Sequence, residues 1–334
     1  MKLATIETIK SLKEHPNADK LEIAQVIGWQ SVVQSGIHKE GDKVVFIVID
    51  TIVPRCQWSE FLVDQKNPDK PIRLKMIKLR GEHSAGIVVP LNQFPASFEL
   101  YDIGTDVTEM IGIQKYVKEL PASLGGENVG DFPTHVASKT DEDNGLSDFK
   151  LVGEVIQHSV TITQKLDGSS CTVIVEDGKI TQVCSRNLSK KETEKSTFWN
   201  AAKKLSILPG FTGVIQGELC GPGIQQNTLR LSEPELFVFQ VKKQDGNYMN
   251  YQEMKGFCNV ELKCNVVPFI TETSFVGCDV DTAIIKLQDL ADQQLLPNKK
   301  PAEGIVIRPT DYPRSYESRR PLGFKIINRN YKDT

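Results

Sequence analysis

Residues 159–176 read Ser-Val-Thr-Ile-Thr-Gln-Lys-Leu-Asp-Gly-Ser-Ser-Cys-Thr-Val-Ile-Val-Glu. Apolar and β-branched residues fill the runs 159–164 and 171–176, and a turn with a glycine separates them, so this stretch predicts two consecutive strands. Lys165 and Asp167 stand two positions apart at the end of the first strand, and both side chains are therefore expected on one face. Lys-x-Asp-Gly by itself is also compatible with an ordinary surface hairpin.

Three further charged residues, Glu218, Glu303 and Lys325, each lie within or beside an apolar run that is typical of a strand. A charge that faces the protein interior costs several kcal/mol unless it is paired or binds a metal. Together with Lys165 and Asp167, these residues predict a shared polar cleft. Ordinary charges on edge strands are the alternative.

The three carboxylates, Asp167, Glu218 and Glu303, can together hold a hydrated divalent cation, because Mg²⁺ and Mn²⁺ favour oxygen ligands. Lys165 and Lys325 would then face phosphate groups. A free lysine has a pKa of about 10.4 and is mostly protonated at neutral pH. A neighbouring cation, either Lys325 or the metal, would lower the pKa of Lys165 and free its amine as a nucleophile.

The chain outside this stretch divides into two strand-rich parts, which makes the predicted fold class α+β. Five short strands near the N-terminus predict an OB-type β-barrel at residues 1–118: 21–27, 29–34, 43–49, 73–79 and 86–90. Residues 119–150 lose periodicity and gain turn-forming residues, which predicts a linker. From residue 152 the pattern is β again, and apolar stripes predict helices over 191–205 and 281–294 within a second, mixed and strand-rich domain at 151–334.

Composition limits the protein class. The chain has 334 residues, and its 40 Lys and Arg against 43 Asp and Glu leave a formal charge of -3, so any site for a polyanion must be local. Its seven cysteines form no Cys-x-x-Cys pair, which argues against a disulfide framework and a structural zinc site. With neither a signal peptide nor a long apolar run, we expect a soluble intracellular protein, cytoplasmic or nuclear, that does not use a membrane.

The charged residues belong to a longer series of motifs. The motifs are Lys165–Gly168, Ser185–Asn187, Gly217–Leu219, Glu235–Gln240, Glu303–Arg308 and Phe324–Lys325. This series resembles, in order, that of the covalent nucleotidyltransferases, which include ATP-dependent RNA and DNA ligases and mRNA capping enzymes. Residues 217–225 are similar to RNA ligases specifically, and the N-terminal part resembles the OB domain that precedes the catalytic domain in one nick-sealing RNA ligase family.

The resemblance implies a role for each matching residue. Lys165 would attack the α-phosphate of ATP and carry AMP, and Lys325 would contact that phosphate. Asp167, Glu218 and Glu303 would position the waters of a Mg²⁺ or Mn²⁺ ion, with Glu218 also close to the ribose. The remaining predicted contacts are Arg186 with the nucleotide or the 5′-phosphate end, and Phe239, or Phe237 on the same strand face, with adenine.

The implied reaction has three steps: lysyl-AMP forms, AMP moves to an RNA 5′-phosphate, and a 3′-OH displaces AMP. The implied partner is RNA, as a nicked duplex of RNA or of RNA and DNA, and we expect a monomer. Two positions depart from the family pattern, Gln164 in place of Glu and Ile327 in place of a second lysine. Arg308, Arg329 and Lys332 are candidates to replace that lysine.

Two other functions remain open at this point: a capping-type nucleotidyltransferase and a noncatalytic RNA-binding OB protein. Capping enzymes place an OB domain after the last lysine motif, and the nine residues that follow Lys325 here disfavour that alternative. The retained set of charged residues disfavours the noncatalytic alternative.

The RNA-binding surface and the approach to the nucleotide pocket each have a candidate segment. Four cations, Arg73, Lys75, Lys78 and Arg80, can follow an RNA backbone, or they can be solvated strand charges. Residues 139–142 resemble a segment that leads into the nucleotide pocket, with plain surface charge as the alternative. We expect Trp29 and Trp58 to pack within the barrel rather than stack on bases.

Overall fold

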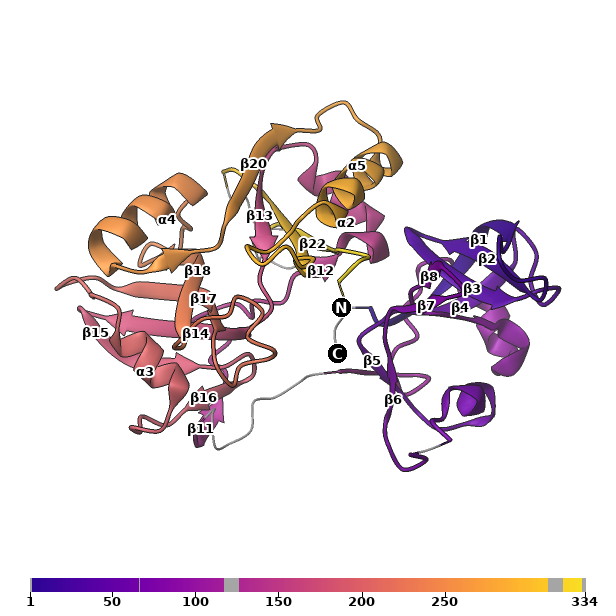
Figure 1. The fold of residues 1–334 in the computed structure, drawn as a ribbon, viewed down its shortest axis with the longest axis horizontal. Helices are drawn as coiled ribbons and strands as arrows, with labels where there is room; N and C mark the ends of the chain where they lie inside the picture. The colour runs from indigo at the N-terminus through magenta and orange to yellow at the C-terminus, as the bar shows by residue number, and fades with distance from the viewer. Residues whose placement is uncertain (1, 66, 117–125, 312–320, 332–334) are drawn as a thin grey trace. The chain divides into compact units, whose positions relative to one another are not determined.

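The structure is a computed structural model that describes residues 2–65, 67–116, 126–311 and 321–331. The chain divides into two units (Figure 1). The N-terminal unit comprises residues 1–118 with 146–149, and the C-terminal unit comprises residues 119–145 and 150–334. No helix in the described part of the chain is both long and apolar enough to cross a membrane.

The N-terminal unit is built on a five-stranded antiparallel sheet in the order β3-β2-β1-β4-β9. Its strands are β1 (Ala4–Glu14), β2 (Leu21–Val26), β3 (Trp29–Gln34), β4 (Lys43–Ile47) and β9 (Ile87–Pro90). A second sheet has the order β10 (Gln114–Lys115), β5 (Thr51–Val53) and β6 (Ile72–Leu74), and β7 (Ile77–Leu79) pairs with β8 (Glu82–Ser84). Short 3-10 helices complete the unit: η1 (Gln57–Leu62), η2 (Leu91–Gln93) and η3 (Ala96–Leu100).

Strand β1 lies at the centre of this sheet, although the sequence did not predict it. It pairs with β4 through Ala4 to Thr8 and with β2 from Ile9 onward, and its register shifts between Ile9 and Ser11. The buried Ile6 and Ile9 are three positions apart, which is not the spacing of a regular strand. The bulge and the change of partner therefore hide the strand from a search for period-two alternation.

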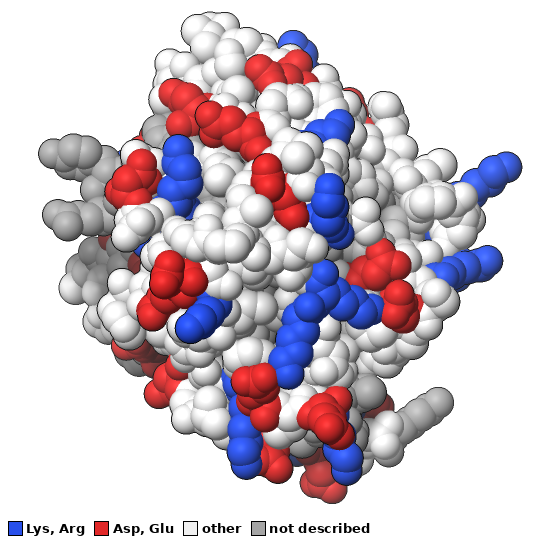
Figure 2. All heavy atoms as spheres, turned by 90° about the vertical axis from the view of Figure 1, so that its left-hand side faces the viewer, with Lys and Arg blue, Asp and Glu red and all other residues white. Residues whose placement is uncertain are grey.

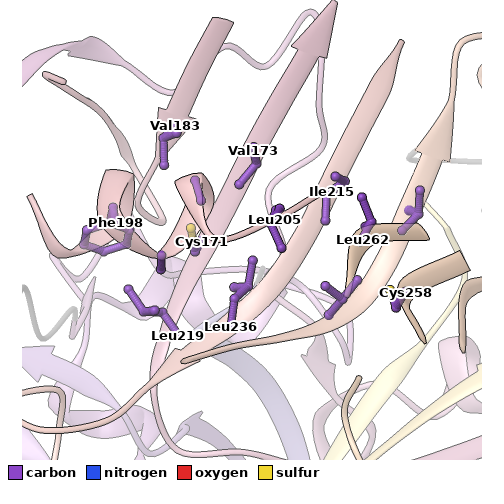
Figure 3. Close-up of a cluster of buried hydrophobic side chains, with 14 of the residues drawn as sticks. Cys171, Val173, Val183, Phe198, Leu205, Ile215, Leu219, Leu236, Cys258 and Leu262 are labelled. Carbon is purple, nitrogen blue, oxygen red and sulfur yellow. The ribbon is translucent and has the colours of Figure 1, made fainter. Parts of the chain in front are cut away.

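The C-terminal unit holds two sheets. The larger has the order β11-β16-β15-β14-β17-β18-β19. Its strands are β11 (Asn128–Asp131), β16 (Leu188–Lys190), β15 (Lys179–Cys184), β14 (Ser169–Glu176), β17 (Gly213–Cys220), β18 (Glu235–Lys243) and β19 (Asn265–Val266). Its apolar face packs in a buried cluster with residues of α3 (Thr197–Lys203), α4 (Tyr251–Phe257) and the π-helical turn η5 (Cys258–Leu262), as Figure 3 shows for Phe198, Ile215 and Leu262.

The smaller sheet has the order β12-β22-β21-β13-β20. Its strands are β12 (Asp143–Asn144), β22 (Phe324–Ile327), β21 (Gly304–Pro309), β13 (Ser159–Lys165) and β20 (Phe269–Ser274). Helix α5 (Val280–Asp292) packs on β21 and β22, and α2 (Phe149–Val155) and η4 (Gly145–Ser147) precede β13. Two strands of the C-terminal unit, β11 and β12, lie within the segment that the sequence predicted as a linker.

Helix boundaries differ from the predicted ones for local reasons. The helix predicted over 191–205 is limited to α3, because residues 188–190 pair as β16 and Ser196 caps the helix by accepting a hydrogen bond from the Trp199 amide. Asp279 caps α5 in the same way. Helix α2 occupies part of the segment from residue 152 that we predicted as β, and α4 begins at a capping box formed by Asn250 and Glu253 that we did not predict.

The connection between β13 and β14 decides where the chemistry can lie. β13 belongs to the smaller sheet and β14 to the larger one, so residues 166–168 carry the chain from one sheet to the other. Lys165 is the last residue of β13, and Asp167 lies within the connection.

Candidate active site

Lys165 and Glu303 form an ion pair at the end of β13. β13 is antiparallel to β21, with Lys165 opposite Gly304, so Glu303 lies immediately beside the lysine. Lys165 Nζ is 2.6 Å from Glu303 Oε1, and the two side chains are only 22% and 18% exposed. This pairing follows from the register of the two strands.

Glu218 reaches the same place from the larger sheet. β14 pairs with β17, and Ser170 lies opposite Glu218, so the connection that carries Asp167 passes directly beside Glu218. A Cβ atom at Gly168 would lie 2.5 Å from the Leu219 carbonyl oxygen and 2.9 Å from Glu218 Cγ. Only glycine therefore allows the connection to approach β17 this closely.

The carboxylates control the charge of Lys165. Burial by itself lowers the pKa of Lys165, but the negative charges of Glu303 and Glu218 outweigh burial and raise the pKa above its ordinary value. We expected a neighbouring cation to lower this pKa. In the structure the dominant neighbours of Lys165 are acidic, so its amine is held as an ammonium group.

The pKa values of the two partly buried glutamates, Glu218 and Glu303, are higher than that of a solvated carboxyl. Burial raises the pKa of Glu218 to about 8, although Lys165 acts against this shift. Burial also raises the pKa of Glu303, and Lys165 again opposes the effect. The site therefore concentrates acidic groups whose ionised form is costly in isolation. A bound cation would stabilise that ionised form.

One atom of the site has the character expected of a metal-binding group. Glu303 Oε2 is buried and has no hydrogen-bond partner among the residues that the structure describes, whereas Oε1 of the same carboxylate faces Lys165. Across the described residues, no three His, Cys, Asp or Glu side chains converge closely enough to hold a metal ion directly. The residues present thus fit a cation that keeps its own water molecules, as Mg²⁺ usually does.

Lys325 lies in β22 on the other side of β21. It is opposite Val306 of β21 and beside Asn144 of β12, and its positive charge acts on the carboxyl of Glu303. A Cβ atom at Gly304 would lie 2.2 Å from the Ile326 carbonyl oxygen, so glycine is required where β21 and β22 come together. The structure thus places Lys165 and Lys325 on the two strands that flank β21, and Glu303 immediately before β21.

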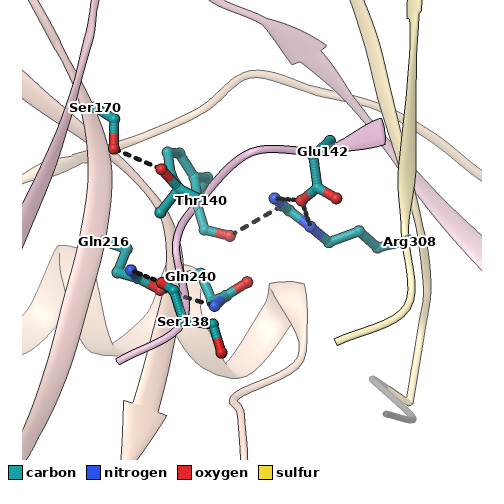
Figure 4. Close-up of polar contacts among 8 residues, drawn as sticks. Ser138, Thr140, Glu142, Ser170, Gln216, Gln240 and Arg308 are labelled. Atoms are coloured by element: carbon teal, nitrogen blue, oxygen red, sulfur yellow. Dashed lines mark hydrogen bonds and ion pairs between the residues drawn. The ribbon is translucent and has the colours of Figure 1, made fainter. Parts of the chain in front are cut away.

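The segment predicted to lead into the nucleotide pocket, residues 139–142, runs between the two sheets together with Ser138 and contacts both (Figure 4). We call residues 138–142 the lead-in segment. The Ser138 carbonyl accepts a hydrogen bond of 2.9 Å from Gln216 Nε2, and the Thr140 hydroxyl bonds to that of Ser170. Lys139 Nζ donates to Asn187 Oδ1 over 3.0 Å. These partners show that the lead-in segment is not a run of solvated charges.

The last two residues of the lead-in segment pair with arginines. Asp141 forms an ion pair with Arg186, whose Nε lies 2.9 Å from Asp141 Oδ2. Glu142 Oε1 accepts from both Nε and Nη2 of Arg308, with 3.0 Å to Nε. Arg186 and Arg308 therefore connect the larger and the smaller sheet, respectively, to one short segment.

The two candidate adenine-stacking residues lie on β18. Phe237 is opposite Glu218, and the register shift between β17 and β18 leaves Phe239 as the extra residue of a bulge. Arg308 lies over the Phe239 ring, 5.3 Å from its centroid, and its Nη1 donates to the Phe239 carbonyl over 3.3 Å. Of the two phenylalanines, Phe239 is therefore the one that contacts Arg308, which in turn binds Glu142 of the lead-in segment.

The candidates to replace the missing lysine at Ile327 have other partners. Arg308 binds Glu142, and Arg329 binds Asp292 of α5 through its Nε, 2.6 Å from Oδ2. Lys332 lies outside the described residues. Gln164, which stands where many relatives carry Glu, is buried and donates to the Leu295 carbonyl.

The four N-terminal cations differ in their surroundings. Arg73 binds Asp50 over 2.9 Å and lies 3.7 Å from the centroid of the Tyr116 ring, whereas Lys75, Lys78 and Arg80 are exposed. Arg73 therefore has a structural partner on each side. Trp29, as expected, packs in the unit: it is buried, and its indole donates to the Ser147 hydroxyl.

Sequence reasoning missed several residues of the site. Ser170 and Gln216 bind the lead-in segment, Gln240 donates to Gln216 over 2.9 Å, and Tyr331 donates to Asp167. None of these positions combines a charge with an apolar run, which was the signal that led to the others. The acidic run from Asp141 to Asp143 was visible, but its partners were not.

Two family models match the sequence: an RNA ligase model over residues 158–325 and an OB-fold domain model over residues 3–91. Solved structures of Naegleria gruberi RNA ligase are similar over nearly the whole chain. A variant with ATP and Mn is 27% identical, with a TM-score of 0.81 and coverage of 98% of this chain and 97% of that chain. A second variant, with AMP and Mn, has the same values.

A third variant of the Naegleria enzyme, without ligand, is 26% identical, with a TM-score of 0.82 and coverage of 98% of this chain and 96% of that chain. A comparison with curated protein sequences finds no match. Together the matches confirm the predicted α+β order, with an OB fold followed by a strand-rich catalytic fold.

Proposed function

Because this chain belongs to the RNA ligase family and is an ATP-dependent RNA ligase, we propose that it joins a 3′-OH to a 5′-phosphate through lysyl-AMP and RNA-adenylate, at nicks in a duplex. One observation carries this proposal. The Lys165 amine lies in a largely buried site, 2.6 Å from Glu303 and within the field of Glu218 and Asp167. Such surroundings hold the lysine side chain in place. Its amine can lose its proton when the charge of the neighbouring groups changes.

The first step makes lysyl-AMP. Lys165 Nζ attacks the α-phosphorus of ATP, a nitrogen–phosphorus bond forms, and the bond to the β-phosphate breaks so that pyrophosphate leaves. The amine must lose a proton, and Glu303 Oε1, 2.6 Å away, is its nearest acceptor. The raised pKa of Glu303 makes this carboxylate a stronger base than a solvated one.

The second and third steps return Lys165 to its starting state. An oxygen of the RNA 5′-phosphate attacks the AMP phosphorus, the bond to Lys165 breaks, the lysine nitrogen takes back a proton from Glu303, and RNA-adenylate forms. The RNA 3′-OH then attacks the 5′-phosphorus, AMP leaves, and the hydroxyl proton passes to solvent. In every step Lys325 and Arg186 would bind phosphate oxygens and Phe239 would hold the base, so these residues align the reacting groups.

Asp167, Glu218 and Glu303 would hold a hydrated Mg²⁺ or Mn²⁺ ion. When bound, the cation neutralises phosphate charge and offsets the negative field that keeps Lys165 protonated. The orphaned Glu303 Oε2 supports this assignment, because a water molecule of the ion would satisfy it.

RNA binding is assigned to the N-terminal unit, with the protein acting as a monomer. Lys75, Lys78 and Arg80 are exposed, and an OB fold commonly binds single strands and nucleic-acid ends along its sheet. On the face that Figure 2 shows, basic and acidic side chains are interspersed, so it gives no local positive field. We therefore place the RNA backbone elsewhere.

The experiment is self-labelling with ATP that carries radioactive phosphorus at the α-position, in the presence of Mn²⁺ or Mg²⁺. Wild-type protein should retain label after denaturation, and Lys165→Ala should retain none. Lys179→Ala is the matched control, because Lys179 is an exposed lysine of β15. Labelling of Lys165→Ala at the wild-type level would refute the assignment of the nucleophile.

A second assay tests the substrate. Duplexes with one nick, carrying a 5′-phosphate and either RNA or DNA on the 3′-OH side, are compared with single strands of the same sequence. Sealing of the nicked duplex with release of AMP is the expected result. Efficient self-labelling with joining of single strands alone would overturn the duplex assignment while leaving the nucleophile in place.

A further inference from the structure

Tyr331 lies four residues beyond β22 and contacts the active site directly. Its phenol hydroxyl donates a hydrogen bond of 2.6 Å to Asp167 Oδ2, across 164 residues of sequence. Asp167 is in the connection between the two sheets and is one of the three carboxylates assigned to the cation. Neither the motif series nor the predicted site includes Tyr331.

The turn that carries Tyr331 is anchored to the strand of another site residue. The Asn328 amide donates to the Glu303 carbonyl over 3.0 Å, and the Asn328 side chain is fully buried. That side chain donates to the Gln294 carbonyl and accepts from the Asn330 amide over 2.8 Å. The Tyr331 amide closes the turn by donating to the Asn328 carbonyl over 3.0 Å.

A second anchor holds the turn against α5. The Arg329 amide donates to Asp292 Oδ1 over 2.7 Å, and Arg329 Nε donates to Oδ2 of the same carboxylate. The side chain of Gln288 joins Asp292 to the Ile327 carbonyl. The turn thus keeps its place through Asn328 and Arg329, and the phenol hydroxyl of Tyr331 is not required to hold it.

We propose that Tyr331 is a positioning residue that fixes the orientation of the Asp167 carboxylate toward the hydration shell of the catalytic cation. This inference rests on the proposed function, which assigns Asp167 to that cation. A carboxylate on a short side chain can rotate, and a donor bound to Oδ2 selects one orientation and leaves Oδ1 for a water molecule of the ion. Donors of this kind behind metal-binding groups commonly change metal affinity by about 10–100-fold when they are removed.

The test removes only the hydroxyl, with Tyr331→Phe. Mn²⁺ binding is measured by electron paramagnetic resonance of the free ion, with an ATP analogue that has a methylene group between the α- and β-phosphates and so cannot react. We expect the dissociation constant for Mn²⁺ to rise about 10-fold. The melting temperature should stay at the wild-type value, and excess Mn²⁺ should restore the rate of self-labelling.

Tyr101→Phe is the matched control, because it removes the same atom in the N-terminal unit, where Tyr101 packs against Phe98. A second comparison uses Asp167→Asn with and without Tyr331→Phe. If Tyr331 acts through the Asp167 carboxylate, the tyrosine substitution should add nothing to the loss of Mn²⁺ affinity in the Asp167→Asn background.

The proposal is overturned if Tyr331→Phe binds Mn²⁺ as tightly as wild type, or if its effect is undiminished in the Asp167→Asn protein. It is also overturned if the variant melts at a lower temperature and excess Mn²⁺ does not restore labelling, because the hydroxyl would then support the fold alone. Absence of labelling in the wild type would instead refute the proposed function.

Discussion

Removing the Glu142 carboxylate should destabilise the C-terminal unit by about 3 kcal/mol, because the buried guanidinium of Arg308 loses the negative charge of Glu142. Arg308 is 7% exposed and Glu142 is 19% exposed. Two guanidinium nitrogens, Nε and Nη2, share one oxygen of Glu142, and Nη1 donates to the Phe239 carbonyl over 3.3 Å. Glu142→Ala therefore removes the carboxylate that accepts from two of the Arg308 nitrogens.

Replacing Arg308 instead of Glu142 is less costly in stability. Arg308→Met keeps much of the side-chain volume, and Glu142, at 19% exposure, is more accessible to water than Arg308 at 7%, so we expect a smaller loss of about 2 kcal/mol. The double variant removes both charges, so the cost of the unpaired Arg308 guanidinium disappears and the loss should fall to about 2 kcal/mol. The interaction between the two sites is therefore about 3 kcal/mol in a double-mutant cycle.

Urea unfolding followed by circular dichroism gives these energies, and amide hydrogen exchange assigns the loss to peptides from β21 and the lead-in segment. Glu192→Ala is the control, because the Glu192–Lys203 pair is more than half exposed on both sides and should contribute at most about 0.5 kcal/mol. Additive losses in the double variant, or a Glu142→Ala protein as stable as wild type, would refute the reasoning.

Three other predictions follow from the same structure. Gly168→Ala should lower the self-labelling rate about 100-fold, because a Cβ atom would lie 2.5 Å from the Leu219 carbonyl oxygen and displace Asp167. In metal-free protein, the melting temperature of Glu218→Gln minus that of wild type should increase as the pH rises from about 5 to 8. The folded-state pKa of Glu218 is about 8 against 4.5 for an exposed glutamate, so wild type loses stability across this interval. Lys75→Ala and Lys78→Ala should each reduce the slope of the logarithm of the RNA-binding constant against the logarithm of salt concentration by about 0.7–0.9. Arg73→Met should leave that slope unchanged and lower the free energy of unfolding by about 1 kcal/mol.

Each of these has a result that contradicts it. Gly130→Ala, at a glycine with open space around its Cβ position, should label normally, and equal losses in the two glycine variants would reject the close-approach argument. Parallel pH curves for wild type and Glu218→Gln would show that Glu218 is ionised in the folded protein. A reduced salt slope in Arg73→Met would show that Arg73 contacts phosphate despite its bonds to Asp50 and Tyr116.

The charged cluster could be predicted because each of its members stands out from its immediate neighbours. Glu218, Glu303 and Lys325 are charges in apolar strands, and strand pairing alone brings such residues together. Burial of a charge is costly, so its presence in an apolar run already implies a partner. The identity of that partner follows from register, which the sequence does not state.

The contacts of the lead-in segment could not be predicted, because they join residues that nothing local connects. Glu142 and Arg308 are 166 residues apart, and the segment around Glu142 has no periodicity that places it in a sheet. An acidic run in an aperiodic stretch has the same appearance whether it is solvated or paired. Arg73 shows the converse, since a count of four nearby cations does not reveal that one of them is already bound to Asp50 and Tyr116.

The site is formed where the chain passes from one sheet to the other, so the distances between some of its residues depend on the angle between the two sheets. Lys165 and Glu303 belong to the smaller sheet, Glu218 to the larger one, and Asp167 to the connection between them. A small change in the angle between the sheets would alter the distances from Glu218 to Lys165 and Glu303 while leaving the Lys165–Glu303 pair intact. The lead-in segment contacts both sheets through separate side chains, so it resists that change. Variants of the lead-in segment should therefore impair cation binding more than they impair the pairing of Lys165 with Glu303.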